Sequence, residues 1–278
     1  MSSILTNNSA MVALQTLKSI NNSLAKTQSE IATGKTIATA KDNSAIWAIS
    51  KVMEADVAGF KQISDQLSLG ESTVAVASAA SEQITNVLTD IKELVVAATS
   101  ESADHTKIGT DITALTEQVT AIISAAQFNG ANLLVADVDG NGASSLTVLS
   151  SLDRSGGAVT ASTISIASVD FENNIDLSDI DVSDATTAVA SLANIETHLQ
   201  TAINGAASLG SAARRLEDQG NFVSKLTDAM KSGIGTMVDA DMEEASARLQ
   251  ALQVQQQLGI QSLSIANQAP QSLLSLFR

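Results

Sequence analysis

The stretch SAMVALQTLKSINNSLAKTQSEI, residues 9–31, carries small and aliphatic side chains at intervals of three and four residues. The members of this series are Ala10, Ala13, Leu17, Ile20, Leu24, Thr27 and Ile31. Side chains with this spacing share one face of an α-helix. The stripe is narrow, as in the seam of a coiled coil, so the sequence predicts a helix that needs a partner.

The other end of the chain has a matching pattern. Its series is Met242, Ala245, Leu249, Leu252, Leu263 and Ala266, with Gln256 and Gly259 at seam positions in the weaker stretch QVQQQLG. Val254, Leu258 and Ile260 point away from this seam. Because the two ends are alike in length and pattern, we expect them to pair as an antiparallel coiled coil, each helix spanning roughly 45 Å at ~1.5 Å per residue.

Acidic residues are absent from both ends. The chain has 15 Lys and Arg against 30 Asp and Glu, a net charge of −15, yet the first acid is Glu30 and the last is Glu244. A segment without acids can be buried beside copies of itself, whereas the acidic middle belongs in water. The overall charge argues against nucleic acid and against a membrane surface as partners.

Helical spacing continues inward from both ends. One register covers Ile46, Ile49, Met53, Phe60, Ile63, Leu67, Val74, Ala77, Ile84, Val87, Ile91, Leu94 and Ala98, with Asp56 and Gly70 as interruptions. A third segment runs from Ile108 to Ala126 after the polar turn SESADHTK, and a fourth from Leu192 to Met237. A helix of ~55 residues needs partners, so the sequence predicts a helical bundle.

The period changes between the third and fourth helical segments. SSLTVLSSL and VTASTISIASVDF are rich in β-branched residues, and RSGG between them is turn chemistry. The fold class predicted is therefore mainly α, with long antiparallel helices from both chain ends and a small β-hairpin insert. We expect residues 1–43 with 234–278 to form a terminal coiled coil. Residues 44–136 with 185–233 would form an inner helical rod, and 137–184 a short outward-facing insert.

Motifs for chemistry are weak. DVDGNG, from Asp137, matches the start of a calcium loop, but Val148 stands where a bidentate Glu is required, so we interpret it as an acidic turn. His105 and His198 are expected to face solvent, and the chain has no cysteine. The sequence contains no P-loop and no GxSxG nucleophile motif. We therefore expect no enzyme activity, no metal and no cofactor.

Stretches at both ends of the chain carry a specific resemblance. LTNNSAMVALQTLKSINNSLAKTQSEIATGKTIATAKDNSA, from Leu5, includes a break at Thr33-Gly34. It resembles the N-terminal segment of the bacterial flagellins, the subunits of the flagellar filament. FNGANLL, from Phe128, resembles a family signature. The chain from Gly233 onward is similar to the family's C-terminus. DNSAIW, where Ile46 and Trp47 replace Gly and Leu, resembles the α-proteobacterial branch.

The resemblance implies a self-polymerising subunit that transmits motor torque for swimming. It implies terminal segments that are disordered in the monomer and ordered in the filament, and export through the flagellar type III apparatus without a cleaved signal peptide. No cleavable signal is evident in residues 1–20. Implied partners are copies of itself, the filament cap, hook-associated proteins and an export chaperone. The short middle of the chain implies that large outer domains are missing.

The apolar positions of the two ends are the expected assembly residues. They are Leu17, Ile20, Leu24, Ile31, Leu249, Leu252, Leu263, Leu273, Leu274, Leu276, Phe277 and Arg278. Trp47, the single tryptophan, is either a core anchor or a subunit contact. Pro270, the single proline, is expected to end the last helix, leaving an apolar tail for neighbouring subunits. Two rival functions remain, a hook–filament junction protein and an enzyme on a flagellin scaffold.

Overall fold

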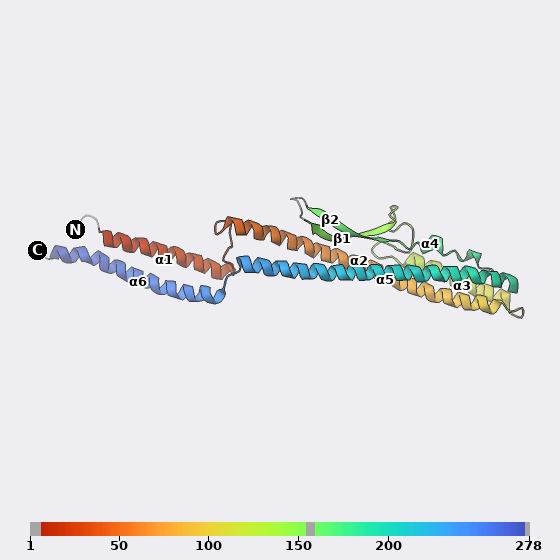
Figure 1. Cartoon of the computed structure of the whole chain (residues 1–278). Coiled ribbons are helices and arrows are strands. Elements are labelled where there is room, and N and C mark those ends of the chain that lie inside the picture. The colour runs from red at the N-terminus through yellow and green to blue at the C-terminus, as the bar shows by residue number, and fades with distance from the viewer. Residues whose placement is uncertain (1–6, 154–158, 276–278) are drawn as a thin grey trace. The chain divides into compact units, whose positions relative to one another are not determined.

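The computed structural model describes residues 7–153 and 159–275, and it is mainly helical, as the sequence predicts (Figure 1). The long helices are α1 (Asn8–Thr33), α2 (Ser44–Ala98), α3 (His105–Ala125), α5 (Ala185–Val238) and α6 (Met242–Ser275). One antiparallel hairpin, β1 (Ser145–Asp153) with β2 (Thr160–Ala167), lies between α3 and α5. The short helices α4 (Phe171–Asn174) and η2 (Leu177–Asp179) follow it.

The chain divides into two compact units, which we describe separately. The first comprises residues 1–55 and 229–278, and the second comprises residues 56–228. The three-part division expected from the sequence remains a prediction. None of the described helices is long and apolar enough to cross a membrane.

Helices α1 and α6 pack closely along each other in the first unit (Figure 1). Every predicted seam position of α1 is half-buried or buried, and the positions between them are mostly exposed. Gly259 lies in the seam of α6 opposite Leu17. A Cβ added at that glycine would lie 3.1 Å from the Leu17 Cδ1, so a larger residue would crowd the leucine. A small residue therefore accommodates a large one, which lets the two helix backbones approach.

Two linkers in the same unit hold each other through their backbones. Gly34 ends α1 in the left-handed conformation, with a φ of 69°, which favours glycine. Its carbonyl accepts from the Ala240 N–H at 2.9 Å, and the Val238 carbonyl accepts from the Thr36 N–H at 2.8 Å. Lys35 and Asp239 thereby form an antiparallel bridge between the two connections. The Thr33-Gly34 break predicted from the sequence is a helix end stabilised by this pairing.

The second unit has a fully enclosed apolar core. Ile63, Val74, Ile84 and Ile91 of α2 are completely buried, and so is Ile195 of α5. Their side chains repeat at the predicted spacing, which confirms the long second helix. Lys92 of α2 forms an ion pair with Glu196 of α5 at the surface of this core.

The FNGANLL stretch, residues 128–134, reverses the chain after α3. Asn129 and Gly130 both have positive φ, 50° and 84°, as in a tight type I′ turn. The Asn132 side chain donates to the Ile123 carbonyl at 2.7 Å, beside the longer 3.4 Å bond from the Ala126 N–H at the end of α3. The Leu134 carbonyl accepts from the backbone N–H that begins α4, at 2.7 Å.

Glycines on the helices receive side chains of the insert. A Cβ added at Gly70 would lie 2.7 Å from a Val148 methyl group, and one at Gly205 would lie 2.5 Å from the Phe171 ring. Phe171 is fully buried. Gly70 is thus a docking position for the hairpin, whereas the sequence pattern showed it only as an interruption of the seam.

The structure corrects four further expectations. Ile49 is 52 % exposed rather than in the seam. His198 is buried, because Asp179 of η2 reaches its Nε2 at 3.1 Å, so it does not face solvent. Helix α6 does not end before Pro270 but continues to Ser275. The fourth helix also begins earlier than its apolar pattern, because the Asp184 carboxylate accepts from the Thr186 N–H and caps it.

Candidate assembly surface

The predicted assembly residues fall into two groups. Those on α1 and α6 that precede Pro270 are half-buried along the seam between the two helices, namely Leu17, Ile20, Leu24, Ile31, Leu249, Leu252 and Leu263. They therefore pack within one chain. Leu273 and Leu274 lie in α6, and Leu276, Phe277 and Arg278 lie outside the described residues. The contribution of both groups to contacts between subunits stays a prediction.

The outer faces of α1 and α6 carry a second apolar set, which the seam pattern did not include as assembly residues. Its members are Met11, Val12, Leu14, Val254, Leu258, Ile260 and Ile265, each more than half exposed. Their exposure on a well-formed helix pair is a signal for association, because large apolar patches on a folded surface mark interaction sites. The sequence placed Val254, Leu258 and Ile260 off the seam, and the structure confirms that.

A groove of about 860 Å³ lies between α1 and α6. Val12 and Ile20 line it from α1, and Leu258 and Gly259 line it from α6. Its position brings exposed apolar side chains from both chain ends to one surface. Such a groove fits the apolar side chains of another helix.

Two polar contacts connect α1 with α6 at points along their length. The Gln256 amide donates to the Asn21 side-chain oxygen at 2.7 Å. Near the helix end, the Asn7 amide donates to the Ala266 carbonyl at 2.7 Å. Because hydrogen bonds have fixed geometry, these contacts set the register of an otherwise apolar pairing.

Trp47 lies half-buried near the start of α2 in the first unit. An ion pair connects this region to the linker after α1, since Glu54 contacts the Lys35 Nζ at 3.4 Å and the Lys51 Nζ at 2.6 Å. The hydrogen bond from Lys51, followed by that from Lys35, lowers the pKa of Glu54 below its ordinary value. Trp47 as a subunit contact stays a prediction.

The acidic turn that begins at Asp137 uses its carboxylates on its own backbone. Asp137 Oδ1 accepts from the Gly142 N–H at 2.8 Å, and Asp139 Oδ1 accepts from the Asn141 N–H at 2.9 Å. The backbone hydrogen bond from Asn141, followed by one from Ala143, lowers the pKa of Asp139. Within the described ranges, no three acidic, histidine or cysteine side chains gather as a metal site.

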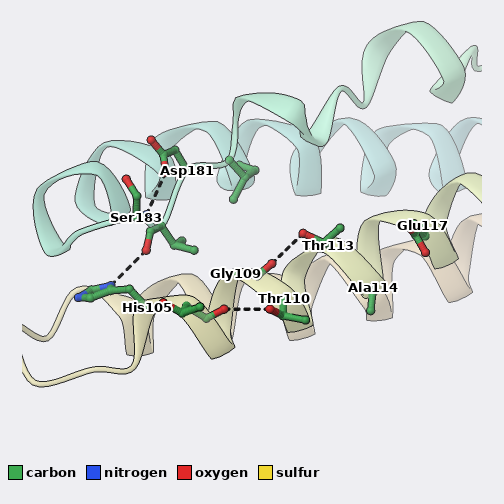
Figure 2. A pocket seen from close by; sticks show the side chains of 11 residues that line it. His105, Gly109, Thr110, Thr113, Ala114, Glu117, Asp181 and Ser183 are labelled. Atoms are coloured by element: carbon green, nitrogen blue, oxygen red, sulfur yellow. Dashed lines mark hydrogen bonds between the residues drawn. The ribbon is translucent and has the colours of Figure 1, made fainter.

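A polar groove in the second unit offers little chemistry. It lies between α3 and residues 180–183 and has a volume of about 710 Å³ (Figure 2). The His105 ring contacts the Val182 carbonyl at 3.1 Å, and the Thr110 and Thr113 hydroxyls donate to carbonyls of their own helix (Figure 2). The groove pairs no nucleophile with a base among its described residues, so it provides no constellation for acyl or phosphoryl transfer.

The chain has paired terminal helices with exposed apolar faces and a separate enclosed helical core. These features define a class of protein whose helices associate with one another. The comparisons with known proteins agree with this class. The chain matches the bacterial flagellin N-terminal helical region over residues 4–139 and the bacterial flagellin C-terminal helical region over residues 192–277. The chain belongs to the bacterial flagellin family, which is a family of structural proteins.

Relatives from α-proteobacteria match over the full length. Flagellin FljK of Caulobacter vibrioides is 42% identical over 284 residues, covering 100% of this chain and 99% of the relative. Flagellin of Brucella melitensis is also 42% identical, over 287 residues and 100% of both chains. Flagellin C of Rhizobium meliloti is 34% identical over 325 residues, again with full coverage of both.

A solved structure supports the fold alone. A putative flagellar hook-associated protein from Vibrio parahaemolyticus superposes with a TM-score of 0.54 at 12% sequence identity. The match covers 71% of this chain and 100% of that one.

Proposed function

We propose that this chain is the subunit of a bacterial flagellar filament, which polymerises with copies of itself and transmits motor torque for swimming. The observation that carries the proposal is the full-length match to flagellins at 42% identity, together with apolar faces left exposed on α1 and α6. Heterologous contacts between such faces need not close into a ring, so they build an open helical fibre. Its work is done by packing, and no catalytic step is required.

The same proposal sets where the protein acts and what it meets. The subunit is extracellular in the assembled flagellum and is exported without cleavage of a signal peptide. Its partners are the filament cap, the hook-associated proteins and an export chaperone for the C-terminal helices. Terminal segments that order only on assembly keep the free subunit from polymerising early, because the ordering entropy is offset only by contacts with neighbours. The half-exposed seam of α1 and α6 supports this proposal, because contacts with neighbouring subunits are still available to it.

Seeded elongation tests the proposal. Purified protein is added to sheared filament fragments, and fibre length is measured by electron microscopy. We expect fibres to lengthen with subunit concentration, and a strain lacking the gene to lose or shorten its filaments. Failure of the purified chain to elongate any seed, with unchanged filaments in the deletion strain, would sink the proposal.

The rival function of a hook–filament junction protein makes a different prediction for copy number. A junction protein occurs in few copies per flagellum, whereas a filament subunit is its main component. Quantitative mass spectrometry of isolated flagella separates the two. The full-length identity to flagellins favours the filament subunit.

A further inference from the structure

Pro270 lies inside α6, which runs from Met242 to Ser275. In an α-helix the N–H of each residue donates to the carbonyl four residues earlier. Proline has no N–H, so the carbonyl of Ala266 loses its helical donor at this position. A carbonyl without a donor next to packed side chains destabilises the helix that carries it.

A side chain from the opposite end of the chain supplies the missing donor. The Asn7 Nδ2 donates to the Ala266 carbonyl oxygen at 2.7 Å, across 259 positions of sequence. The contact is partly buried, so water competes with it less than at an open surface. Both helices belong to the same compact unit.

The oxygen of the same side-chain amide caps the N-terminus of α1. The Asn7 Oδ1 accepts from the Ala10 N–H at 3.1 Å, which makes Asn7 the N-cap of that helix. An amide is the side chain that accepts on one atom and donates on the other. Aspartate can cap but cannot donate, and serine can cap but is too short to reach a second helix.

We propose that Asn7 is a positioning residue that couples the start of α1 to the passage of α6 through Pro270. When the amide is in place, α1 is capped and α6 continues beyond the proline. When it is absent, the first turn of α1 and the last turns of α6 lose their support together. Asn7 thereby supports the passage of α6 through Pro270 to Ser275, and the assembly effect of this rests on the proposed filament function.

A double-mutant cycle tests this coupling in the full-length chain. Asn7→Ser keeps the cap and removes the donor, while Pro270→Ala restores the backbone N–H that Ala266 lacks. We expect Asn7→Ser to raise the critical concentration for seeded elongation about tenfold with Pro270 present, because loss of this partly buried hydrogen bond leaves the Ala266 carbonyl without a donor. In the Pro270→Ala background, the same change should have an effect of about twofold or less.

Asn22→Ser is the matched control, because it makes the same chemical change at an exposed position of α1 that does not line the groove between α1 and α6. It should leave the critical concentration unchanged. An equal effect of Asn7→Ser in the wild-type and Pro270→Ala backgrounds would overturn the inference, and so would an equal effect of Asn22→Ser.

Amide hydrogen exchange provides a second measurement on the same samples. We expect faster exchange at residues 271–275 in Asn7→Ser, and recovery in the double variant. Where the chain elongates, exchange is measured on the fibres, because the proposed function has the terminal helices ordered only there. Where it does not elongate, exchange is measured on the free chain. Equal exchange in wild type and Asn7→Ser would contradict the inference in either sample. Failure of wild type to elongate while the exchange pattern holds counts instead against the proposed filament function.

Discussion

Helices α1 and α6 repeat the same three-and-four spacing as α2 and α5, yet the two pairs bury it to different depths. Along α2 the seam includes fully buried Ile63, Val74 and Ile84, whereas along α1 most seam positions remain half-exposed. Two helices alone cover only the line along which they meet. In the second unit, α3 and the hairpin add further walls around the core (Figure 1). Equal patterns therefore give one self-sufficient core and one surface that needs neighbours.

Removal of residues 268–278 should give the largest separation between the two units. We expect complete loss of seeded elongation, because the apolar tail and the last turns of α6 are removed. The second unit should keep its thermal transition by circular dichroism, since its core lies within residues 56–228. Stable filaments from the truncated chain would show that the tail is not an assembly element.

Gly205→Ala should weaken the second unit rather than assembly. The new methyl would lie 2.5 Å from the buried Phe171 ring, which overpacks the core and lowers the free energy of unfolding by about 1–3 kcal/mol. Gly210→Ala is the matched control, because a Cβ added at Gly210 would meet no atom of the described residues within 4 Å. The control should be neutral or stabilising, since alanine favours a helix. Equal unfolding midpoints in urea would contradict this account of the docking site.

Leu258→Gln, in the first unit, should weaken assembly and leave folding stability nearly unchanged. The side chain is 59 % exposed, so the free energy of unfolding should change little. If it is buried in the fibre, the critical concentration should rise about tenfold, from loss of about 1.5 kcal/mol of apolar burial. Leu258→Met retains the apolar volume and should elongate normally. Normal elongation by the Gln variant would remove Leu258 from the assembly surface.

Acid should have a small effect at the start of α5. The N–H groups of Thr187 and Thr186 hold the pKa of Asp184 below its ordinary value of 3.8. A depressed folded pKa adds stability above the unfolded value, and that stability is lost as pH falls through the folded value. Asp184→Asn keeps a capping oxygen without titrating, so its melting temperature should fall less than that of wild type below about pH 3.8. Parallel melting curves between pH 6 and pH 3 would contradict this.

Periodicity predicted most of the fold because local spacing determines helix faces. It predicted the seam of α1 and the hairpin after α3. It also predicted the seam of α6 from Ala245 onward, whereas Met242, its first expected member, is exposed. It could not predict contacts whose partners are distant in sequence, such as Asp179 with His198 or Asn7 with Ala266. Pro270 illustrates this limit. A local rule ends the helix there, but α6 continues, and the Asn7 amide from the other chain end donates to the Ala266 carbonyl four residues before the proline.

The candidate surface was less predictable than the fold. The spacing identified the seam positions, but these pack α1 against α6 within one chain, so they do not show which surface faces a neighbouring subunit. The exposed set on the outer faces follows no simple period, and only Val254, Leu258 and Ile260 stood out as apolar residues off the seam. Placement of Met11, Val12 and Leu14 required knowing which face α6 covers.

The paired linkers have a mechanical consequence. A pull applied along α1 and α6 would enter each linker as tension on its covalent chain. Because Gly34 bonds to Ala240 and Thr36 bonds to Val238, neither linker can extend before several backbone hydrogen bonds yield together. Each such bond contributes only about 1 kcal/mol, but bonds loaded in parallel share the force rather than opening one by one. The bridge thus couples the two linkers stiffly, so that they share a pulling force in place of acting as two independent flexible tethers.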